Sequence, residues 1–558
     1  MSKLPKLNEN GRGWKLLQVV FMALGQAMCA GVAAFATRDI FAHLRLHDNL
    51  IPTQPLILIV FAGLGIAVLR YMERVTGERI GQDYVSELRL RLFKHLSRLP
   101  NHVMEERRRG AVTLRFVGDL SAIRNWISAG IARLISSSIV LPLATLAVFL
   151  INPALGAAAS IPIFAGIALM IIVAPRLGKV HSHLRSRRGN LAIDMSERAP
   201  FAPELRLMGR MKIEQKSLLR RTQDMIAASV KRVKAKSFLR AIPDAISAIA
   251  AASVFYVAFQ SNIRPAEVAG SLAAVGLMVQ PMRDLAGVWD RYRSWLAARD
   301  KCLNLLEKST LRIPRSPDVE FTCKPRSLRF KDVSFGILKN INAEAKKGKK
   351  IAILGPNGGG KSTLLKLAAG LDAPDLGKVR LGDRSPISLN SNVRKRMIGY
   401  VSMRTPILAG SLRRALTMGI AEMPCDTRIK IMAETFGLGE VLERLGGLDG
   451  KVAELGGNLS SGEIRRVMLT RAALSEAHLL LLDEPDDALD AEGPQLLLKL
   501  INSTDATTLL ITHNKAIARS MDEIWFIENG QLVEQGLPDE VLSGSGPIAA
   551  FFTPRSAA

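Results

Sequence analysis

The first half of the chain alternates long apolar segments with strongly polar ones. Six segments are long enough, or nearly so, to cross a bilayer core of about 30 Å, which takes about 20 helical residues. They lie at about 16–37, 55–72, 127–151, 155–174, 238–259 and 266–285. This pattern predicts an all-α membrane domain with six spans.

Positive charge is distributed unevenly between these segments. The short connections at about 42–54, 151–155 and 260–266 carry only Arg45 and Arg264 as Lys or Arg, whereas the long ones at 74–124 and 176–240 are crowded with both. Basic residues collect on the cytoplasmic side of membrane proteins. The N-terminus, the two long loops and, after six spans, the C-terminal half are therefore predicted to be cytoplasmic.

Composition changes this picture little. Hydrophobic residues make up 48% of the chain and the formal net charge is +26, a combination that is rare in soluble domains. A basic chain could also bind nucleic acid, as a soluble nucleic-acid-associated ATPase would. The apolar spans and the one-sided distribution of Lys and Arg favour a membrane protein that binds no nucleic acid.

The two long basic loops contain few helix breakers, so spans two to five are predicted to continue as helices beyond the membrane. Pro100 in the first loop, and Pro200 and Pro203 in the second, mark the points where such helices would turn. A short helix at each turn would face the domain that follows in the chain. We expect the loops to contact that domain.

A different pattern begins after Leu306. Ile313-Pro314-Arg315-Ser316-Pro317-Asp318 is typical of a linker, and from about Ser327 short β-rich runs alternate with helical ones, as in an α/β domain. The expected division is a membrane domain at 1–311, a linker at 312–325, an α/β domain at 326–542 and a loose tail at 543–558.

The α/β domain contains a phosphate-binding loop. A buried-strand run, Ile351–Leu354, leads into Gly355-Pro356-Asn357-Gly358-Gly359-Gly360-Lys361-Ser362-Thr363 and then a helical segment. In such a loop, backbone N–H groups surround phosphates at a helix N-terminus, the lysine provides positive charge and the serine offers a Mg²⁺ ligand. The residues predicted to bind ATP phosphates are Gly355, Asn357, Gly358, Gly360, Lys361, Ser362 and Thr363.

A second buried-strand run, Leu479–Leu482, ends in two carboxylates, Asp483 and Glu484. We expect Asp483, together with Ser362, to hold Mg²⁺. Glu484 is predicted to orient and deprotonate the water that attacks ATP.

With these motifs the chain resembles a bacterial ATP-binding cassette exporter half-transporter, in which one six-helix membrane domain is fused to one α/β P-loop cassette. Leu459-Ser460-Ser461-Gly462-Glu463 is similar to the family signature, in which Ser460 and Gly462 would contact ATP held by a partner subunit. Asp490 resembles the D-loop residue and His513 the switch histidine. Val452-Ala453-Glu454-Leu455-Gly456 resembles a segment that touches the inner loops.

Three positions depart from the family pattern. Met403 stands where the family has Gln, and a thioether is a poor ligand for Mg²⁺, so either water replaces the missing oxygen or hydrolysis and coupling are weaker. No Tyr precedes the phosphate loop to stack on adenine; Phe335 is the candidate substitute, or else a strand residue in the core. Ser461 replaces a Gly of the signature.

The resemblance implies a dimer, because ATP would lie between the phosphate loop of one chain and the signature of another. Glu484 and His513 are both present, which favours a homodimer, while the departures leave a heterodimer open. The implied function is ATP-driven export or flipping across the bacterial inner membrane, with ATP and Mg²⁺ as cofactors. An ATP-gated channel or regulator on the same architecture is the alternative.

The substrate is not defined by the sequence. Lipid, glycolipid, amphipathic drug, peptide, secreted protein and small reduced thiol compound all remain open. Asp244 and Asp284 lie near the cytoplasmic ends of the last two predicted spans. They either line a polar path or are solvated at the membrane interface.

Overall fold

The computed structural model describes residues 4–45, 51–105, 115–311, 326–402, 405–486 and 492–552. The chain divides into two compact units. The helical unit comprises Met1–Ser97 and Arg107–Lys308, and the α/β unit comprises Arg98–Glu106 and Ser309–Ala558. The predicted linker at 312–325 lies outside the described residues. A short piece of the first basic loop therefore belongs to the α/β unit.

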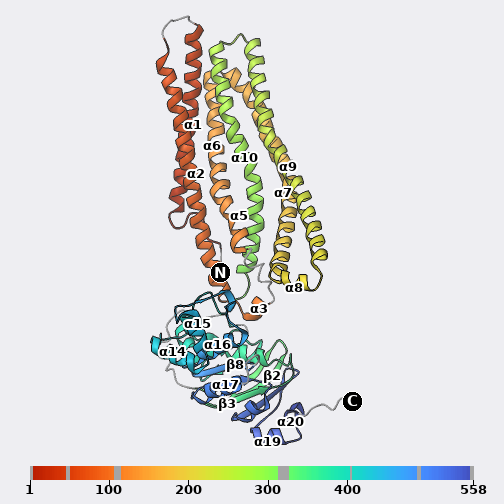
Figure 1. The fold of residues 1–558 in the computed structure, drawn as a ribbon. Helices are drawn as coiled ribbons and strands as arrows, with labels where there is room; N and C mark the ends of the chain where they lie inside the picture. Colours follow the sequence, from red (N-terminus) through yellow and green to blue (C-terminus); the bar gives the residue numbers. More distant parts are fainter. Residues whose placement is uncertain are drawn as a thin grey trace. The chain divides into compact units, whose positions relative to one another are not determined.

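Long helices that run side by side make up the helical unit (Figure 1). They are α1 (Arg12–Arg45), α2 (Thr53–Leu96), α6 (Ala132–Ile151), α7 (Pro153–Arg198), α9 (Met211–Gln260) and α10 (Pro265–Leu306). Shorter segments connect them: two π-helical turns η1 (Arg115–Asp119) and η2 (Trp126–Ile131), the helices α5 (Leu120–Asn125) and α8 (Ala202–Leu207), and a 3-10 turn η3 (Ala199–Phe201).

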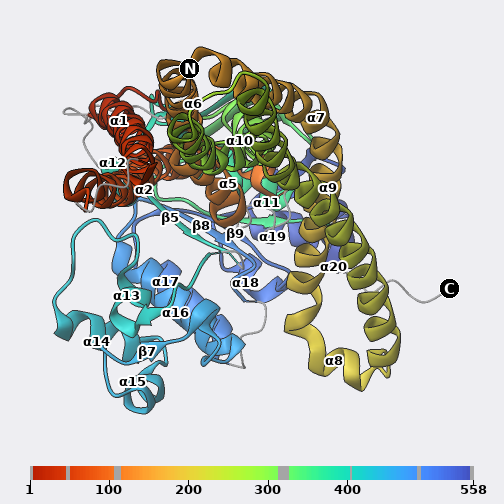
Figure 2. The same ribbon diagram turned by 90° about the horizontal axis from the view of Figure 1, so that it is seen from above.

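Apolar side chains hold two groups of helices together. Helix α1 packs on α2, α6 and α10, while α7 packs along α9. Figure 2 shows α8 at the ends of α7 and α9, as the prolines of the second loop predict. The core between α6, α7, α9 and α10 includes Val148, Leu155 and Val254, which are all fully buried.

Within the part of the chain that the structure describes, five helices are long and apolar enough to cross a membrane, by length and composition. They are Arg12–Leu44, Thr53–Leu96, Phe116–Ile151, Pro153–Pro175 and Met211–Gln260. The sixth predicted span, 266–285, lies on α10, where Gln280, Arg283 and Asp284 lower the hydropathy; its role as a span stays a prediction. Helices α2, α7 and α9 have 44, 46 and 50 residues, so they extend well past a 20-residue span, as predicted.

Two sheets form the frame of the α/β unit. A three-stranded antiparallel sheet has the order β2-β1-β4, and a six-stranded sheet has the order β11-β10-β3-β9-β8-β5. Their bounds are β1 (Leu328–Phe335), β2 (Leu338–Ala345), β3 (Lys350–Leu354), β4 (Leu376–Leu381), β5 (Ile398–Val401), β8 (Leu479–Asp483), β9 (Thr507–Ile511), β10 (Glu523–Glu528) and β11 (Gln531–Gly536). A short ribbon pairs β6 (Gly410–Ser411) with β7 (Lys451–Val452).

Helices pack against these sheets, as expected for an α/β domain. They are α11 (Lys361–Ala368), α12 (Ser391–Met397), α13 (Leu412–Thr417), α14 (Asp426–Thr435), α15 (Gly439–Leu445), α16 (Ser461–Ser475), α17 (Gly493–Asn502), α18 (Lys515–Arg519), α19 (Pro538–Ser543) and α20 (Pro547–Phe552), with 3-10 turns η4 (Pro386–Ser388) and η5 (Glu454–Gly456). One core lies between the two sheets and α11, and another lies under α16 and α17.

Strands β10, β3, β9, β8 and β5 are parallel, so their carboxyl ends meet along one edge of the sheet. The register pairs Asp483 of β8 with Ile511 of β9. The segments that follow β3, β8 and β9 therefore come together in space, although up to about 150 residues separate them in the sequence.

The loose tail predicted at 543–558 is wrong for the residues up to 552. Helix α20 covers Pro547–Phe552, Ile548 is fully buried and Phe551 packs on Phe526 of β10, with ring centroids 5.5 Å apart. Three large apolar side chains in six residues provide enough surface to dock the segment on the sheet. Residues 553–558 lie outside the described part of the chain.

Candidate active site

The predicted phosphate loop connects β3 to α11. Gly355, Gly358 and Gly360 have φ values of 140°, 79° and 107°, which side-chain-bearing residues rarely adopt. At Gly355 a Cβ would come within 2.0 Å of the Ile527 carbonyl oxygen, so the loop also passes too close to β10 for any side chain. Both constraints explain why glycine is required. The loop leads directly into the N-terminus of α11, where a phosphate is favoured.

Lys361 is the first residue of α11, at the end of this loop, and is only 4% exposed. Its ammonium group donates to the carbonyl oxygens of Gly355 at 2.8 Å and Pro356 at 3.1 Å. Burial lowers the pKa of Lys361 below its ordinary value, although Glu484 and Asp483 act in the opposite direction. No carboxylate forms an ion pair with Lys361 among the described residues, so its charge is held ready for an anion.

Ser362 and Asp483, the two predicted Mg²⁺ ligands, are neighbours. The Ser362 hydroxyl donates to the Asp483 carboxylate at 2.9 Å. Burial raises the pKa of Asp483, and the hydrogen bond from Ser362 opposes this only in part. Hydroxyl and carboxylate oxygens are the ligands that Mg²⁺ prefers, so this pair fits the ion.

Glu484 has an unusual backbone conformation for a residue with a side chain, with φ of 50°. Two hydrogen bonds hold it there. The Glu484 N–H donates to the Ile511 carbonyl at 3.2 Å, and the Arg465 side chain donates to the Glu484 carbonyl at 3.0 Å. Such a conformation persists only where the surroundings impose it, which is frequent at functional sites. His513, which follows β9, places Nε2 3.5 Å from the Glu484 carboxylate. The structure thus brings the two predicted catalytic residues together.

Helix α16 begins at the predicted signature. Ser460 caps it: the side chain accepts from the Glu463 N–H, and the Glu463 carboxylate accepts from the Ser460 N–H at 2.8 Å. This reciprocal capping box fixes the start of the helix. Burial acts to raise the pKa of Glu463, but hydrogen bonds from Arg444 and Ser460 outweigh it and lower that pKa. Ser460 and Ser461 are exposed at this end, so the helix N-terminus is open to a ligand.

Two arginines of α16 have a role that the sequence did not reveal. Arg465 is 2% exposed and bonds to Glu484, as described above, and Arg471 is 9% exposed and donates to the Ala415 carbonyl at 2.9 Å. Burial lowers the pKa of Arg471 to about 10. Their spacing of six residues does not place them on one face of a helix with 3.6 residues per turn, so no periodicity of the sequence marked them.

Phe335, the candidate for adenine stacking, ends β1 and is half-buried. Its ring packs edge-on against His102, with centroids 5.4 Å apart. His102 belongs to α3 (Asn101–Glu105), the short helix at the tip of the first basic loop. The prediction that this loop contacts the second domain is therefore confirmed, and Phe335 has a packing role in the domain whether or not it also meets adenine.

Helix α3 is fixed to the α/β unit by further polar contacts. His102 contacts Asp372 twice, through its backbone N–H at 3.1 Å and its ring Nδ1 at 2.8 Å, and Asp372 is only 1% exposed. Glu105 forms an ion pair of 2.8 Å with Lys366 of α11. Because α11 begins at the phosphate loop, α3 is linked to the candidate site through one rigid helix.

The remaining predicted residues include two whose positions the structure does not describe. Met403 and Asp490 lie outside the described residues. In the segment Val452–Gly456, Leu455 has φ of 56° and is 66% exposed; its contact with the inner loops stays a prediction. Asp244 and Asp284 of the helical unit form ion pairs with Arg283 and Arg133.

Comparisons with known proteins cover nearly the whole chain. Residues 17–280 match the family model described as the ABC transporter transmembrane region, and residues 338–487 match the one described as ABC transporter. The ATP-dependent lipid A-core flippase of Desulfotalea psychrophila is 23% identical over 96% of each chain. The glutathione/L-cysteine transport system ATP-binding/permease protein CydC of Escherichia coli is 26% identical over 86% of each chain.

A solved structure has the same fold. It is a bacterial Atm1-family ABC exporter with ATP bound, which is 20% identical to this chain, covers 99% of both chains and gives a TM-score of 0.84.

Proposed function

Because the chain is an ABC transporter, with a helical membrane region followed by an ATP-hydrolysing cassette that drives export or flipping of a substrate, we propose that Glu484 is its catalytic base and that two identical chains form the working dimer. One observation carries this proposal. The phosphate loop, Asp483, Glu484 and His513 follow three neighbouring parallel strands and meet at one sheet edge.

Each side chain has a distinct task at this edge. Backbone N–H groups of the loop and the buried Lys361 bind the β- and γ-phosphates. Glu484 accepts a proton from the attacking water, and its imposed backbone conformation keeps the carboxylate in place. His513, 3.5 Å away, orients that carboxylate and contacts the γ-phosphate. Ser362 and Asp483 would hold Mg²⁺, which neutralises the phosphate charge when it is bound.

The dimer follows from the position of the signature. Ser460 and Gly462 lie at the exposed start of α16, a separate helix from α11, and each chain has one such start and one phosphate loop. A γ-phosphate enclosed from both sides needs a second chain. The lipid A-core flippase and CydC belong to the same family, and a homodimer is favoured here because Glu484 and His513 are both present.

Helix α3 is the proposed route from the cassette to the membrane helices. It continues the chain directly after α2 and contacts α11 through Glu105 and Lys366. A shift of α11 on ATP binding would move α3 and hence the end of α2. This contact provides coupling that does not pass through Met403, where the family usually has Gln.

The position in the cell and the substrate belong to the same proposal. Both termini and the cassette lie in the cytoplasm, and the membrane is the inner membrane of a bacterium, because ATP is inside and the long loops are basic. The related proteins are named for lipid A-core and for glutathione or L-cysteine. These substrates differ greatly, so the names alone select neither, and an ATP-gated channel is the less favoured alternative.

ATP-dependent transport in sealed vesicles tests the function. The protein is reconstituted in proteoliposomes with the cassette outside, and labelled candidate substrates, including a lipid A precursor and glutathione, are added with ATP. Accumulation that depends on ATP and disappears in Glu484→Gln supports export. Solute movement that only follows its gradient would instead indicate a channel.

A further inference from the structure

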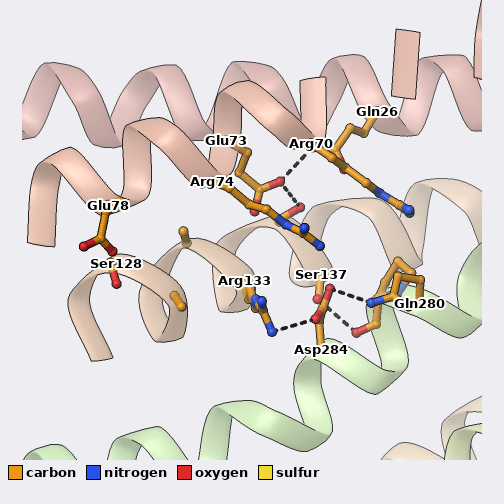
Figure 3. A pocket seen from close by; sticks show the side chains of 14 residues that line it. Gln26, Arg70, Glu73, Arg74, Glu78, Ser128, Arg133, Ser137, Gln280 and Asp284 are labelled. Atoms are coloured by element: carbon orange, nitrogen blue, oxygen red, sulfur yellow. Dashed lines mark hydrogen bonds and ion pairs between the residues drawn. The ribbon is translucent and has the colours of Figure 1, made fainter. Parts of the chain in front are cut away.

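The helical unit contains a polar cavity of about 200 Å³ between α1, α2, α6 and α10. Figure 3 shows its lining side chains, which come from all four helices. Charged groups from three helices line it: Arg70, Glu73, Arg74 and Glu78 from α2, Arg133 from α6 and Asp284 from α10. Such a concentration of charge inside a helical membrane domain marks a functional site by default.

Part of this charge is already neutralised. Arg133 forms an ion pair of 3.0 Å with Asp284, which joins α6 to α10. Glu73 is 7% exposed, and its carboxylate accepts hydrogen bonds from Gln26 at 2.7 Å and Ser136 at 3.2 Å. These contacts explain how the helices hold the wall of the cavity in place. Glu73 is held by neutral donors, and no ion pair joins it to the remaining arginines among the described residues.

Arg70 and Arg74 are those remaining arginines. No hydrogen bond or ion pair is formed by either side chain among the residues that the structure describes. Their spacing of four residues puts them on the same face of α2, where like charges repel. In Figure 3 both extend from α2 toward the side of the cavity where Gln280 and Asp284 lie.

The formal charges of the lining groups sum to zero, but these groups are not all paired with one another. Glu78, the third acidic residue of the lining, lies 3.7 Å from Arg124, which is not part of the lining. Once that pair and the Arg133–Asp284 pair are set aside, two guanidinium groups face one carboxylate, and that carboxylate is bound from behind by neutral donors. The open wall of the cavity is therefore electropositive.

We propose that this cavity binds the oxyanion head group, a phosphate monoester or a carboxylate, of the molecule that this transporter moves, with Arg70 and Arg74 as its ligands. Two guanidinium forks match the oxygens of such a group and bind it by charge-assisted hydrogen bonds. The inference rests on the proposed export function and adds a substrate class to it.

The volume of the cavity limits the size of the group that can bind in it. Because a water molecule occupies about 30 Å³ of liquid, about 200 Å³ holds several water-sized groups. This is room for a small head group, so the rest of a larger molecule would lie outside the cavity. The same chemistry is present in a soluble organic phosphate and in a lipid head group, and the experiment must separate the two sources.

Binding is measured without nucleotide, on the full-length protein in nanodiscs of phosphatidylcholine, by calorimetric titration with hexyl phosphate. Hexyltrimethylammonium serves as the cationic control. We expect hexyl phosphate to bind and the cation not to bind. The double variant Arg70→Gln/Arg74→Gln should weaken binding at least about tenfold, the range typical of hydrogen bonds to charged groups. Equal binding of both probes, or unchanged binding by the double variant, overturns the proposal.

Two further variants guard against a trivial loss of folding. Arg79→Gln changes an exposed arginine of the same helix outside the cavity, and it should leave hexyl phosphate binding and basal ATPase activity unchanged. Asp284→Asn removes the partner of Arg133 and exposes a third cation to the cavity. It should tighten binding severalfold, a gain that misfolding cannot produce; weaker binding by this variant counts against the proposal.

Phosphatidic acid in the discs, a lipid whose head group is a phosphate monoester, separates the two sources of the head group. Competition with hexyl phosphate that depends on Arg70 and Arg74 shows a lipid head group in the cavity, and lack of competition shows a site for soluble anions. ATPase activity in the same discs isolates the export function. Activity that depends on Glu484, with no hexyl phosphate binding, refutes the anion site alone; binding without such activity refutes the transport function alone.

Discussion

In the α/β unit the charged groups of the site are the buried Lys361 and Arg465 and the half-buried Asp483, whereas the helical unit buries Glu73 and partly shields the Arg133–Asp284 pair. Lys361 donates to the backbone carbonyls of Gly355 and Pro356, and Arg465 donates to that of Glu484. Glu73 and Arg133 are bound by side chains of other helices. Both arrangements leave positive charge ready for an anion, the phosphates of ATP in the first and a head group in the second.

The two sites differ in how the amino-acid sequence specifies them. Backbone partners require a local loop conformation, which a contiguous motif specifies, so the cassette site can be located from its sequence. Side-chain partners require helix packing, and no short motif specifies it.

Loss of the Glu484 carboxylate should have the largest effect. In Glu484→Gln the amide fills the same space but cannot accept a proton, so ATP turnover should fall about 10²–10⁴-fold while ATP binding is kept. Steady-state phosphate release and nucleotide binding measure the two steps. Glu528→Gln, which changes a carboxylate at the end of β10 outside the site, is the matched control. Retention of more than about a third of the turnover by Glu484→Gln would remove it from the mechanism.

Loss of the contact between α3 and the cassette should have the second-largest effect. His102→Ala removes the ring partner of Asp372, a carboxylate that is 1% exposed, and leaves it with fewer donors in a buried place, which costs about 1–3 kcal/mol. We expect ATP binding to persist and substrate stimulation of ATPase activity to fall about fivefold or more. Asp375→Asn, an exposed carboxylate in the same loop, should have no effect. Full stimulation in His102→Ala would exclude this route of coupling.

Substitution of Asp483 should stabilise the nucleotide-free protein but weaken its stabilisation by Mg²⁺ and ATP. The pKa of Asp483 is raised mainly by burial, so the folded state holds the proton more tightly than the unfolded state, and stability falls as the pH rises through the range between the two pKa values. At pH 7.5 without nucleotide, Asp483→Asn should therefore raise the melting temperature, by about 1–3 °C. The increase in melting temperature should be smaller at acidic pH.

With Mg²⁺ and ATP the variant should melt at a lower temperature than the wild type, because Asp483→Asn loses a Mg²⁺ ligand and gains less stability from the nucleotide. Thermal melts of the full-length protein at pH 4.5 and 7.5 measure both effects. A lower melting temperature for the variant at pH 7.5 without nucleotide would show that the charged carboxylate stabilises the fold.

Met403→Gln should have the smallest effect. If water replaces the side-chain oxygen of the usual Gln, the substitution should raise ATPase activity at most about twofold, or lower the Mg²⁺ concentration for half-maximal activity. Activity titrated against Mg²⁺ in one lipid mixture decides this. A flat response together with robust wild-type turnover would mean that coupling through α3 suffices and that Met403 has no cost.

Much of the cassette was predictable, because its motifs place each residue next to the strand or helix that positions it. Gly355–Thr363, Asp483, Glu484 and His513 follow β3, β8 and β9 as expected, and their convergence comes from parallel pairing. The link between His102 and Asp372 was not visible as a pair, because 270 residues separate them. Helix α20 was missed because its apolar residues were taken for a polar tail.

In the helical unit the sequence predicted helices and their lengths, but not which polar residues meet. Gln26 and Glu73 are 47 residues apart and come together only through packing of α1 on α2. Asp284 was expected either in a polar path or at the interface, and its pairing with Arg133 depends on the register of α6 against α10. A single apolar pattern allows many such registers.

Native mass spectrometry of Glu484→Gln in Mg²⁺ and ATP tests whether two identical chains enclose ATP at this site and whether Glu484 hydrolyses it. We expect a particle of two chains that retains two ATP molecules, and a Lys361→Ala protein that retains none. A single chain that retains ATP, or a two-chain particle that binds no nucleotide, would contradict this expectation.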